Sequence, residues 1–327
     1  MVELGDADGP GIVTDYVFRI GRSDEGDYYV PFPPEGQLLQ FSPDGVFHAA
    51  IGRTGEGPGE YRSPVLMRGS GENLRVLDMQ TARVTTIRDD EITTSVLPFM
   101  PSDWASLPDG RDVFFALIYD PDRAGHPLHL YDEGSRRIAR SFGSDGVPAD
   151  RSYESRVALE RRIAPAADGN VWAARVNRYR VDKWSPEGVR IARIDRDAPW
   201  FRSWSRSPGL PREVEPLPFI VGVRDWGDGL LMVVLSVADD NWRPMPPARV
   251  IGTETVTSSA QREDLYDTVI EVLDTRSGRV LARTRVDVNA IGLIGRDGLY
   301  SYAEHSEGEP KFVVWSVSLS GGREGRR

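Results

Sequence analysis

Short apolar runs that each follow a glycine turn recur along the chain, and their rhythm predicts a repeated all-β unit. Four of the six turns read Asp-Gly, which is the strongest short hairpin signal. Successive turns lie about forty residues apart at the closest, which is the length of a four-stranded propeller blade. The turns and runs are Gly26 with Tyr28–Val30, Gly71 with Leu74–Leu77, Gly110 with Val113–Leu117, Gly169 with Val171–Ala173, Gly229 with Leu230–Val234 and Gly298 with Leu299–Tyr302.

Each unit continues with a second apolar strand, a polar turn and an outer strand in which apolar and polar residues alternate. The second strands are Leu38–Phe41, Val84–Ile87, Leu128–Tyr131, Val181–Trp184, Thr268–Leu273 and Phe312–Trp315. The outer strands are Val46–Ile51, Ile92–Leu97, Ile138–Phe142, Val189–Ile194 and Val280–Val286. Only Asp150–Arg162 could hold a short helix. The pattern predicts one domain over residues 1–327, a six-bladed β-propeller of four-stranded antiparallel blades, with flexible ends at 1–9 and 321–327.

The sixth unit lacks an outer strand, and the beginning of the chain offers a candidate for it. Gly11–Thr14 is short and apolar, and its addition to the last blade would close the ring and hide the exposed sheet edges. Tyr16–Ile20 would then form the inner strand of the first blade. We therefore expect a ring that the N-terminal strand closes.

The blade register assigns each connection to one face of the ring. Turns between the first and second strands, and between the third and fourth, should lie on one face, and these turns are all tight. The long connections should all lie on the other face: Gly52–Pro64, Tyr119–Pro127, Gly143–Arg156, Asp195–Pro218 and Val237–Asp267. Loops on a rigid scaffold are where binding residues concentrate, so this face is the expected binding surface.

Aromatic and arginine residues are frequent in these connections, and both are typical of interface hot spots. The alternative is that the aromatic residues, in particular Trp200, Phe201 and Trp204, pack the loops onto the rim as small satellite cores. The residues that we expect to contact a ligand are Tyr61, Arg62, Tyr119, Arg156, Trp200, Trp204 and Trp242.

Composition excludes several classes of protein. The hydrophobic fraction of 39% is that of a globular chain, and no apolar run is long enough for a transmembrane segment. The net charge of −10 and the scattered basic residues speak against nucleic-acid binding. The absence of cysteine removes disulfides and thiol chemistry. No signal peptide is visible at Met1–Asp6, and the compartment stays open.

Catalytic and metal motifs are scarce, so we assign no catalytic residue, no cofactor and no metal ligand. His126 and His129 would point to opposite faces of a strand. Asp120–Gly125 begins like a calcium loop, but Ala124 stands where an oxygen ligand is needed. Asp239-Asp240-Asn241 could offer oxygens to a cation, although adjacent acids in a long loop are usually solvated. Nucleophile elbows and phosphate-binding glycine loops are absent from the sequence.

One segment carries a family resemblance. Ile51-Gly52-Arg53-Thr54-Gly55-Glu56-Gly57-Pro58-Gly59-Glu60-Tyr61, followed by the blade Leu74–Val84, resembles the bacterial six-bladed propellers related to NHL repeats. The resemblance covers about Gln37–Ile92, and it implies the propeller fold and an exported or periplasmic location. Asp78 and Arg83 occupy the family's Asp and Arg positions, where a structural role in bracing the hairpin is implied.

Three hypotheses about function remain open. The first is a non-catalytic propeller whose elaborated face binds a protein or a carbohydrate. The second is a metal-dependent hydrolase or lyase, because similar propellers of the lactonase-like group hold a divalent cation, Ca²⁺ or similar, in the central channel. Its candidate ligands here are Asp15, Asp103, Glu160 and Asn289. The third is a structural module of an envelope assembly.

Overall fold

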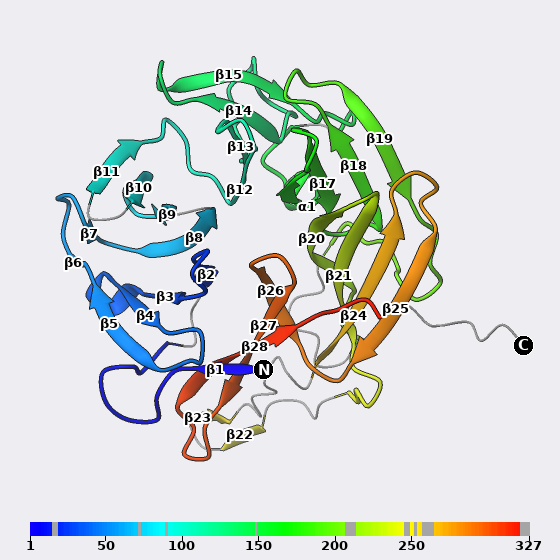
Figure 1. Ribbon diagram of the computed structural model, residues 1–327. Coiled ribbons are helices and arrows are strands. Elements are labelled where there is room, and N and C mark those ends of the chain that lie inside the picture. Colours follow the sequence, from blue (N-terminus) through cyan, green and yellow to red (C-terminus); the bar gives the residue numbers. More distant parts are fainter. Residues whose placement is uncertain are drawn as a thin grey trace, which may run out of the picture.

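The computed structural model shows a ring of six four-stranded antiparallel blades around a central axis (Figure 1). It describes residues 1–14, 19–70, 73–88, 91–147, 149–206, 214–244, 249–251, 254–256 and 265–320. The predicted turn at Gly71 and most of the predicted inner strand Tyr16–Ile20 lie outside these residues. The predicted fold class is confirmed.

The blades follow one another along the chain, and each begins with its innermost strand. Blade 1 consists of β2 (Gly21–Arg22), β3 (Tyr28–Phe32), β4 (Gln37–Phe41) and β5 (Phe47–Ile51). Blade 2 consists of β8 (Pro64–Ser70), β9 (Asn73–Asp78), β10 (Arg83–Arg88) and β11 (Glu91–Val96). Blade 3 consists of β12 (Asp103–Ser106), β13 (Asp112–Phe115), β14 (Leu128–Asp132) and β15 (Arg137–Phe142).

The second half of the ring repeats this order, and the last blade takes its outer strand from the start of the chain. Blade 4 consists of β16 (Arg161–Pro165), β17 (Val171–Arg175), β18 (Arg180–Trp184) and β19 (Arg190–Asp195). Blade 5 consists of β20 (Phe219–Gly227), β21 (Leu230–Ala238), β24 (Tyr266–Asp274) and β25 (Val280–Val286). Blade 6 consists of β26 (Ala290–Ile294), β27 (Gly298–Glu304), β28 (Pro310–Ser316) and β1 (Val2–Leu4).

Short elements decorate the connections. They are β6 (Arg53–Thr54), β7 (Glu60–Tyr61), the 3-10 turn η1 (Pro33–Glu35), the helix α1 (Tyr153–Leu159), β22 (Arg249–Ile251) and β23 (Glu254–Val256). The predicted short helix within Asp150–Arg162 is thus confirmed as α1. Within the described residues, the structure contains no helix with the length and apolarity that a membrane crossing requires.

The strand that closes the ring is Val2–Leu4, and the prediction of Gly11–Thr14 was wrong. Val2 pairs with Val314 and Leu4 with Phe312, and Leu4 is fully buried against the core of blades 6 and 1. Val13 is buried in the same cluster without pairing in the ladder. Both segments are short and apolar, so hydrophobicity alone did not distinguish the pairing strand from a packed loop. The inner strand of blade 1 is β2, directly after the predicted Tyr16–Ile20.

The core consists of separate apolar clusters between neighbouring blades, because each sheet buries both of its faces against the next blade. Trp104, for example, lies on β12 and packs against Phe114 and against the blade 2 residues Val65 and Leu77. Trp172 lies in the corresponding cluster between blades 4 and 5. This arrangement makes each blade depend on both neighbours for burial of its apolar surface.

A buried histidine gives this core a dependence on pH. Nε2 of His129 lies 3.2 Å from the carbonyl oxygen of Ala116, which can only accept, so Nε2 donates. Nδ1 lies 2.8 Å from the hydroxyl of Ser141 and accepts from it in the neutral ring. Burial lowers the pKa of His129 to about 4. The folded state therefore holds this ring without a proton at pH values where the unfolded chain has already bound one.

The free energy of unfolding is expected to fall as the pH drops from about 6.5 to about 4, by about 3 kcal/mol from this residue. In that range the unfolded state binds more protons than the folded state, so acid favours unfolding. Urea titrations at pH 7, 5.5 and 4.5 measure the effect. His129→Gln should reduce the dependence of the unfolding free energy on pH, whereas His48→Gln, at an exposed position, should leave that dependence unchanged. If His129→Gln kept the wild-type pH dependence, His129 would not be its source.

Candidate functional site

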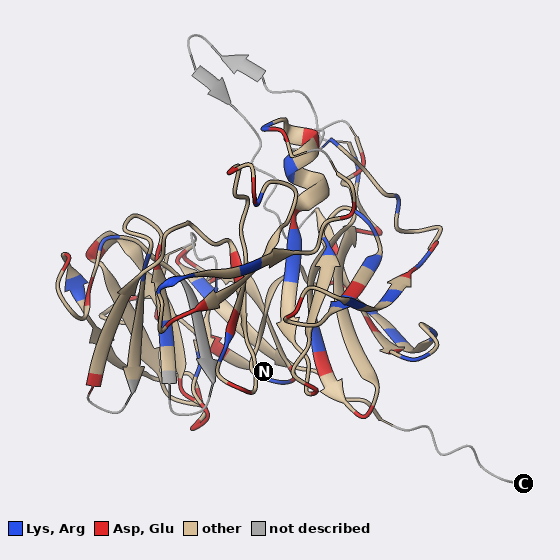
Figure 2. Ribbon diagram, turned by 90° about the horizontal axis from the view of Figure 1, so that it is seen from above, with Lys and Arg blue, Asp and Glu red and all other residues tan. Residues whose placement is uncertain are grey.

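The long connections lie on one face of the ring, as the register predicted. Figure 2 shows α1 standing beyond one side of the disc. The strand order places the described ends of the segments 52–63, 116–127, 143–160, 196–218 and 239–265 on this side, which we call the loop face. The connection 5–20 joins them, because β1 is the outer strand of blade 6 and leads into β2 of blade 1. The turns of the opposite face that lie within the described residues are tight.

Three of these connections meet around α1. The guanidinium of Arg151 lies over the ring of Tyr119 at 5.2 Å, which joins α1 to the segment 116–127. Arg206 forms an ion pair with Glu154 of the helix, which joins α1 to the segment that follows blade 4. We call the surface formed by Tyr119, Arg151, Tyr153, Arg156 and Arg206 the α1 platform.

The helix orients this platform. Ser152 caps α1, and its hydroxyl accepts a hydrogen bond from the backbone N–H of Ser155 at 3.1 Å. Val157 and Leu159 are buried, so the helix has a defined inner side. Tyr153 and Arg156 are one turn apart on the other side, and Tyr153 is 46% exposed. The predicted contact residue Arg156 is therefore in a position to meet a ligand, and its role stays a prediction.

A network of charged groups holds the start of the connection 143–160, which contains α1. Asp145 accepts hydrogen bonds from Arg161, Arg175 and Arg193, the last at 2.7 Å. Burial opposes the charged carboxylate, but these arginines outweigh it and lower the pKa of Asp145 to about 2. Burial, together with the charge of Arg175, lowers the pKa of Arg161 to about 9. Arg161 also donates to the carbonyl oxygen of Ala158 at 2.8 Å, so the network joins the end of α1 to Asp145 at the start of the connection.

The tryptophans after blade 4 hold their loop to the rim. Trp200 packs edge-on against Tyr179 at 6.0 Å, and the guanidinium of Arg283 covers it at 4.4 Å. Trp204 donates its indole N–H to the carbonyl oxygen of Pro218 at 2.7 Å, and its backbone N–H to that of Asn177 at 3.2 Å. These contacts favour the satellite-core interpretation of Trp200 and Trp204 over direct ligand contact.

Tyr61 and Arg62 lie at the inter-blade linker. Tyr61 is buried between blades 1 and 2, beside Leu38 and Val76, so the structure removes it from the candidate surface. Its burial raises its pKa to about 12. Arg62 is exposed and forms an ion pair with Glu56 at 2.6 Å. A tyrosine in a loop looks the same in sequence whether it faces inward or outward, and only the packing decided this.

Asp78 and Arg83 brace this linker. The carboxylate of Asp78 accepts from the backbone N–H groups of Gln80 at 2.9 Å and Thr81 at 3.1 Å, and also from those of Arg62 and Ser63. Arg83 donates to the carbonyl oxygen of Glu56 in the same linker. Asp78 therefore braces the hairpin turn, as the sequence implied, whereas the side chain of Arg83, within the described residues, contacts the linker and not the hairpin.

Two of the four proposed channel ligands form ion pairs with arginines. Asp103 lies at the loop-face end of β12, where it forms an ion pair with Arg19 at 2.7 Å and accepts from the backbone N–H of Ile163 at 3.0 Å. Glu160 pairs with Arg162 at 2.9 Å. Asn289 is buried with its amide oxygen 3.4 Å from the hydroxyl of Ser236. Asp15 lies outside the described residues. At Asp103 and Glu160 the arginine partner opposes the binding of a metal ion.

A group of carboxylates gathers elsewhere on the loop face. Asp239, Asp267 and Asp287 each place a carboxylate oxygen within 4.8 Å of the others. Burial raises the pKa of Asp267, and the charge of Asp239 adds to this, while Arg285 acts against it. The sequence indicates Asp239 as a possible source of cation ligands, but its convergence with Asp267 and Asp287 cannot be read from the sequence. The predicted contact residue Trp242 is half-buried beside this group, and its backbone N–H donates to the carbonyl oxygen of Asp239 at 3.0 Å.

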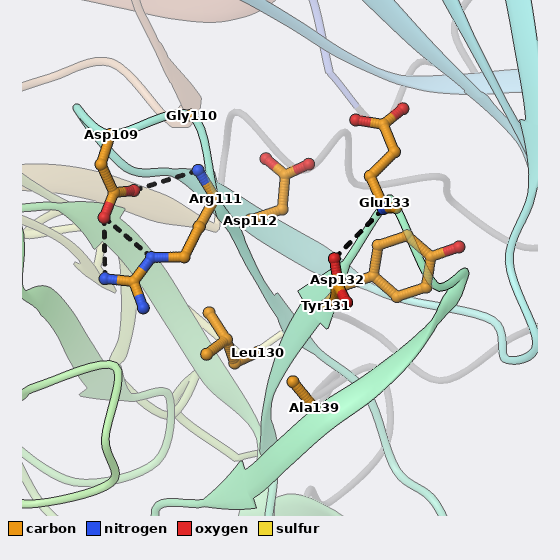
Figure 3. Close-up of a pocket in the computed structure, with 10 residues that line it drawn as sticks. Asp109, Gly110, Arg111, Asp112, Leu130, Tyr131, Asp132, Glu133 and Ala139 are labelled. Carbon is orange, nitrogen blue, oxygen red and sulfur yellow. Dashed lines mark hydrogen bonds and ion pairs between the residues drawn. The ribbon is translucent and has the colours of Figure 1, made fainter.

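The opposite face contains a hollow in blade 3. Its volume is about 450 Å³, and it lies between the turns Asp109–Asp112 and Tyr131–Gly134 (Figure 3). Arg111 is held by Asp109 at 2.8 Å, and Asp112 by Arg75 at 2.6 Å. These pairs neutralise Asp109 and Asp112, whereas Asp132 and Glu133 also line the hollow and leave it acidic.

Comparisons with known proteins show what the chain resembles. No family model matches it, and no curated protein matches it either. A Bacteroides fragilis protein described as exported is 12% identical, with a TM-score of 0.58 over 97% of this chain and 94% of that one. A DUF4221 family member from Bacteroides vulgatus is 10% identical, with a TM-score of 0.58 over 97% of both chains.

A streptogramin B lyase is 10% identical, with a TM-score of 0.50 over 96% of this chain and 97% of that one. At such identities the likeness reports the path of the backbone and carries no information about ligands or chemistry. By fold, the chain is therefore a six-bladed β-propeller like those of bacterial proteins.

Proposed function

We propose that this protein is a non-catalytic binding propeller whose loop face presents the α1 platform to a protein or glycan ligand. The observation that carries the proposal is the joining of three connections around one capped helix. Tyr119 with Arg151 and Glu154 with Arg206 fasten the helix on two sides. Loops that are fixed in this way lose less conformational entropy when they bind, and so present their side chains at low cost.

The chemistry of the platform suits a partner with acidic and apolar groups. Tyr153 and Arg156 point outward from one side of α1, and Arg151 and Arg206 flank them. Tyrosine and arginine are the residues most enriched in interface hot spots, and tyrosine rings also stack on sugar faces. We expect truncation of these side chains to weaken binding by about tenfold or more.

A paired variant tests this surface. Tyr153→Ala/Arg156→Ala should reduce the binding of ligands selected by wild-type protein from a glycan array and from a displayed peptide library. The matched control is Glu133→Ala/Glu187→Ala, which changes two exposed turn residues on the opposite face. Equal binding by wild type and the platform variant, or an equal loss in the control, would overturn the proposal.

We also propose that the chain is related to NHL-repeat propellers and works outside the cytoplasm. The first part is supported by Arg83, which contacts the Gly52–Tyr61 linker, and by Asp78, which holds the backbone directly after it at Arg62 and Ser63. The second is supported by the family resemblance and by the fold neighbour that is described as exported. An export test with the native gene, followed by fractionation of the cell, measures the location directly.

A further inference from the structure

Three carboxylates from separate strands meet at the loop-face end of blade 5. Asp239 follows the last residue of β21, Asp267 lies at the start of β24, and Asp287 follows the last residue of β25. These strands are hydrogen-bonded neighbours, with Val237 opposite Asp267 and Thr268 opposite Val286. The sheet itself therefore brings the three side chains together, and their oxygens lie within 4.8 Å of one another.

Their negative charge is poorly balanced. Arg285 is the partner of this group within the described residues, and it bonds Asp267 at 2.6 Å and the neighbouring Asp240 at 2.7 Å. Four carboxylates thus share one guanidinium when Asp239 and Asp287 are included. Like charges at such separations repel one another strongly in a partly buried site, and a bound cation would relieve the repulsion.

One buried oxygen of the group lacks a partner. Asp267 is only 4% exposed, and its Oδ2 accepts from Arg285 and from the backbone N–H of Asp240. Its Oδ1 is buried and has no hydrogen-bond partner among the described residues. An unsatisfied buried acceptor costs about 1–3 kcal/mol, so native structures usually give such an atom a ligand.

We propose that Asp239, Asp267 and Asp287 bind a calcium ion. Ca²⁺ takes six to eight oxygen ligands at about 2.3–2.6 Å, so it can bridge oxygens with the observed spacing, and water can complete its shell. Mg²⁺ prefers a stricter octahedron with one or two carboxylates and several waters. Three carboxylates from three chain segments fit Ca²⁺ better.

The ion would fasten the base of the longest connection on the loop face. Asp239 begins the segment 239–265 and Asp267 lies two residues after its end, and the base of the segment is already joined by the hydrogen bond from Asp239 N to Leu265 O at 3.0 Å. Asp287 lies on the connection that enters blade 6. Binding therefore ties blade 5 to the path into blade 6 and raises the stability of the fold. This proposal does not depend on the α1 platform.

Calorimetric titration with CaCl₂ after EDTA treatment tests the site. Wild type should bind one Ca²⁺ per chain and show a higher thermal midpoint in millimolar CaCl₂ than in EDTA, with a smaller rise in equal MgCl₂. Asp239→Asn/Asp287→Asn should bind at least tenfold more weakly and lose the rise, because it replaces two of the three carboxylates with neutral amides. This variant keeps the buried Asp267–Arg285 pair, so it should still fold.

Asp122→Asn is the matched control. It removes an exposed acid from another connection of the same face, so its calcium affinity should equal that of wild type. Terbium gives an independent measurement, because Trp242 lies beside Asp239 and should sensitise the emission of a bound ion. The proposal fails if wild type neither takes up Ca²⁺ nor sensitises terbium, or if the double variant binds as wild type does.

Discussion

Replacement of Leu4 with aspartate is expected to lower the free energy of unfolding by about 4 kcal/mol, a loss that a single substitution rarely causes. Leu4 is fully buried in β1 and packs in the cluster between blades 6 and 1. The change deletes its apolar contacts and places an unpaired charge in the core. It also weakens the pairing of β1 with β28, which protects the edge of the last sheet.

Urea unfolding monitored by tryptophan fluorescence measures this effect, and light scattering reports edge-to-edge association. Glu3→Ala is the matched control, since Glu3 precedes Leu4 in the same strand and forms an exposed ion pair with Lys311 at 3.0 Å. It should cost less than about 1 kcal/mol. If Leu4→Asp lowered the free energy of unfolding only slightly, the stability of the ring would not depend on closure by β1.

Replacement of Glu271 with alanine is expected to cost about 3–5 kcal/mol, because it leaves the half-buried Arg196 without its counter-charge and the buried hydroxyl of Tyr179 without its acceptor. Glu271 lies in β24 and is 1% exposed. It accepts from the hydroxyl of Tyr179 and from Arg196. Burial, with the charge of Glu271, raises the pKa of Tyr179. The contacts of Glu271 with Tyr179 and Arg196 join blade 5 to blade 4 beside Trp200.

Thermal and urea unfolding measure the loss. Arg178→Ala is the control, because Arg178 forms an exposed ion pair with Asp195 at 3.1 Å near the same connection and should cost less than about 1 kcal/mol. Since Arg196 also covers the ring of Tyr179 at 4.6 Å, movement of this group should shift the tryptophan emission. Equal stabilities of the two variants would show that the buried network contributes little.

The sequence predicted the blades well because their signals are local. A strand pattern such as that of Val280–Val286, or a turn such as Asp168-Gly169, depends only on residues that are neighbours in the sequence. The strands of the structure lie where these local patterns predict them. The phase of the repeat also placed the long connections correctly, since it follows from strand order. The role of α1 as a platform could not be predicted, because the contact of Tyr119 with Arg151 and that of Glu154 with Arg206 join separate connections.

The sequence by itself determined the repeat, the number of blades and the face that carries the long connections. Only the tertiary structure decided that Val2–Leu4 closes the ring, that Tyr61 faces inward, and that Asp239, Asp267 and Asp287 converge. The physical reason is the distance along the chain over which each kind of interaction acts. Hydrophobic periodicity and turn chemistry act over a few residues, whereas closure and convergence depend on which distant segments the ring brings into contact.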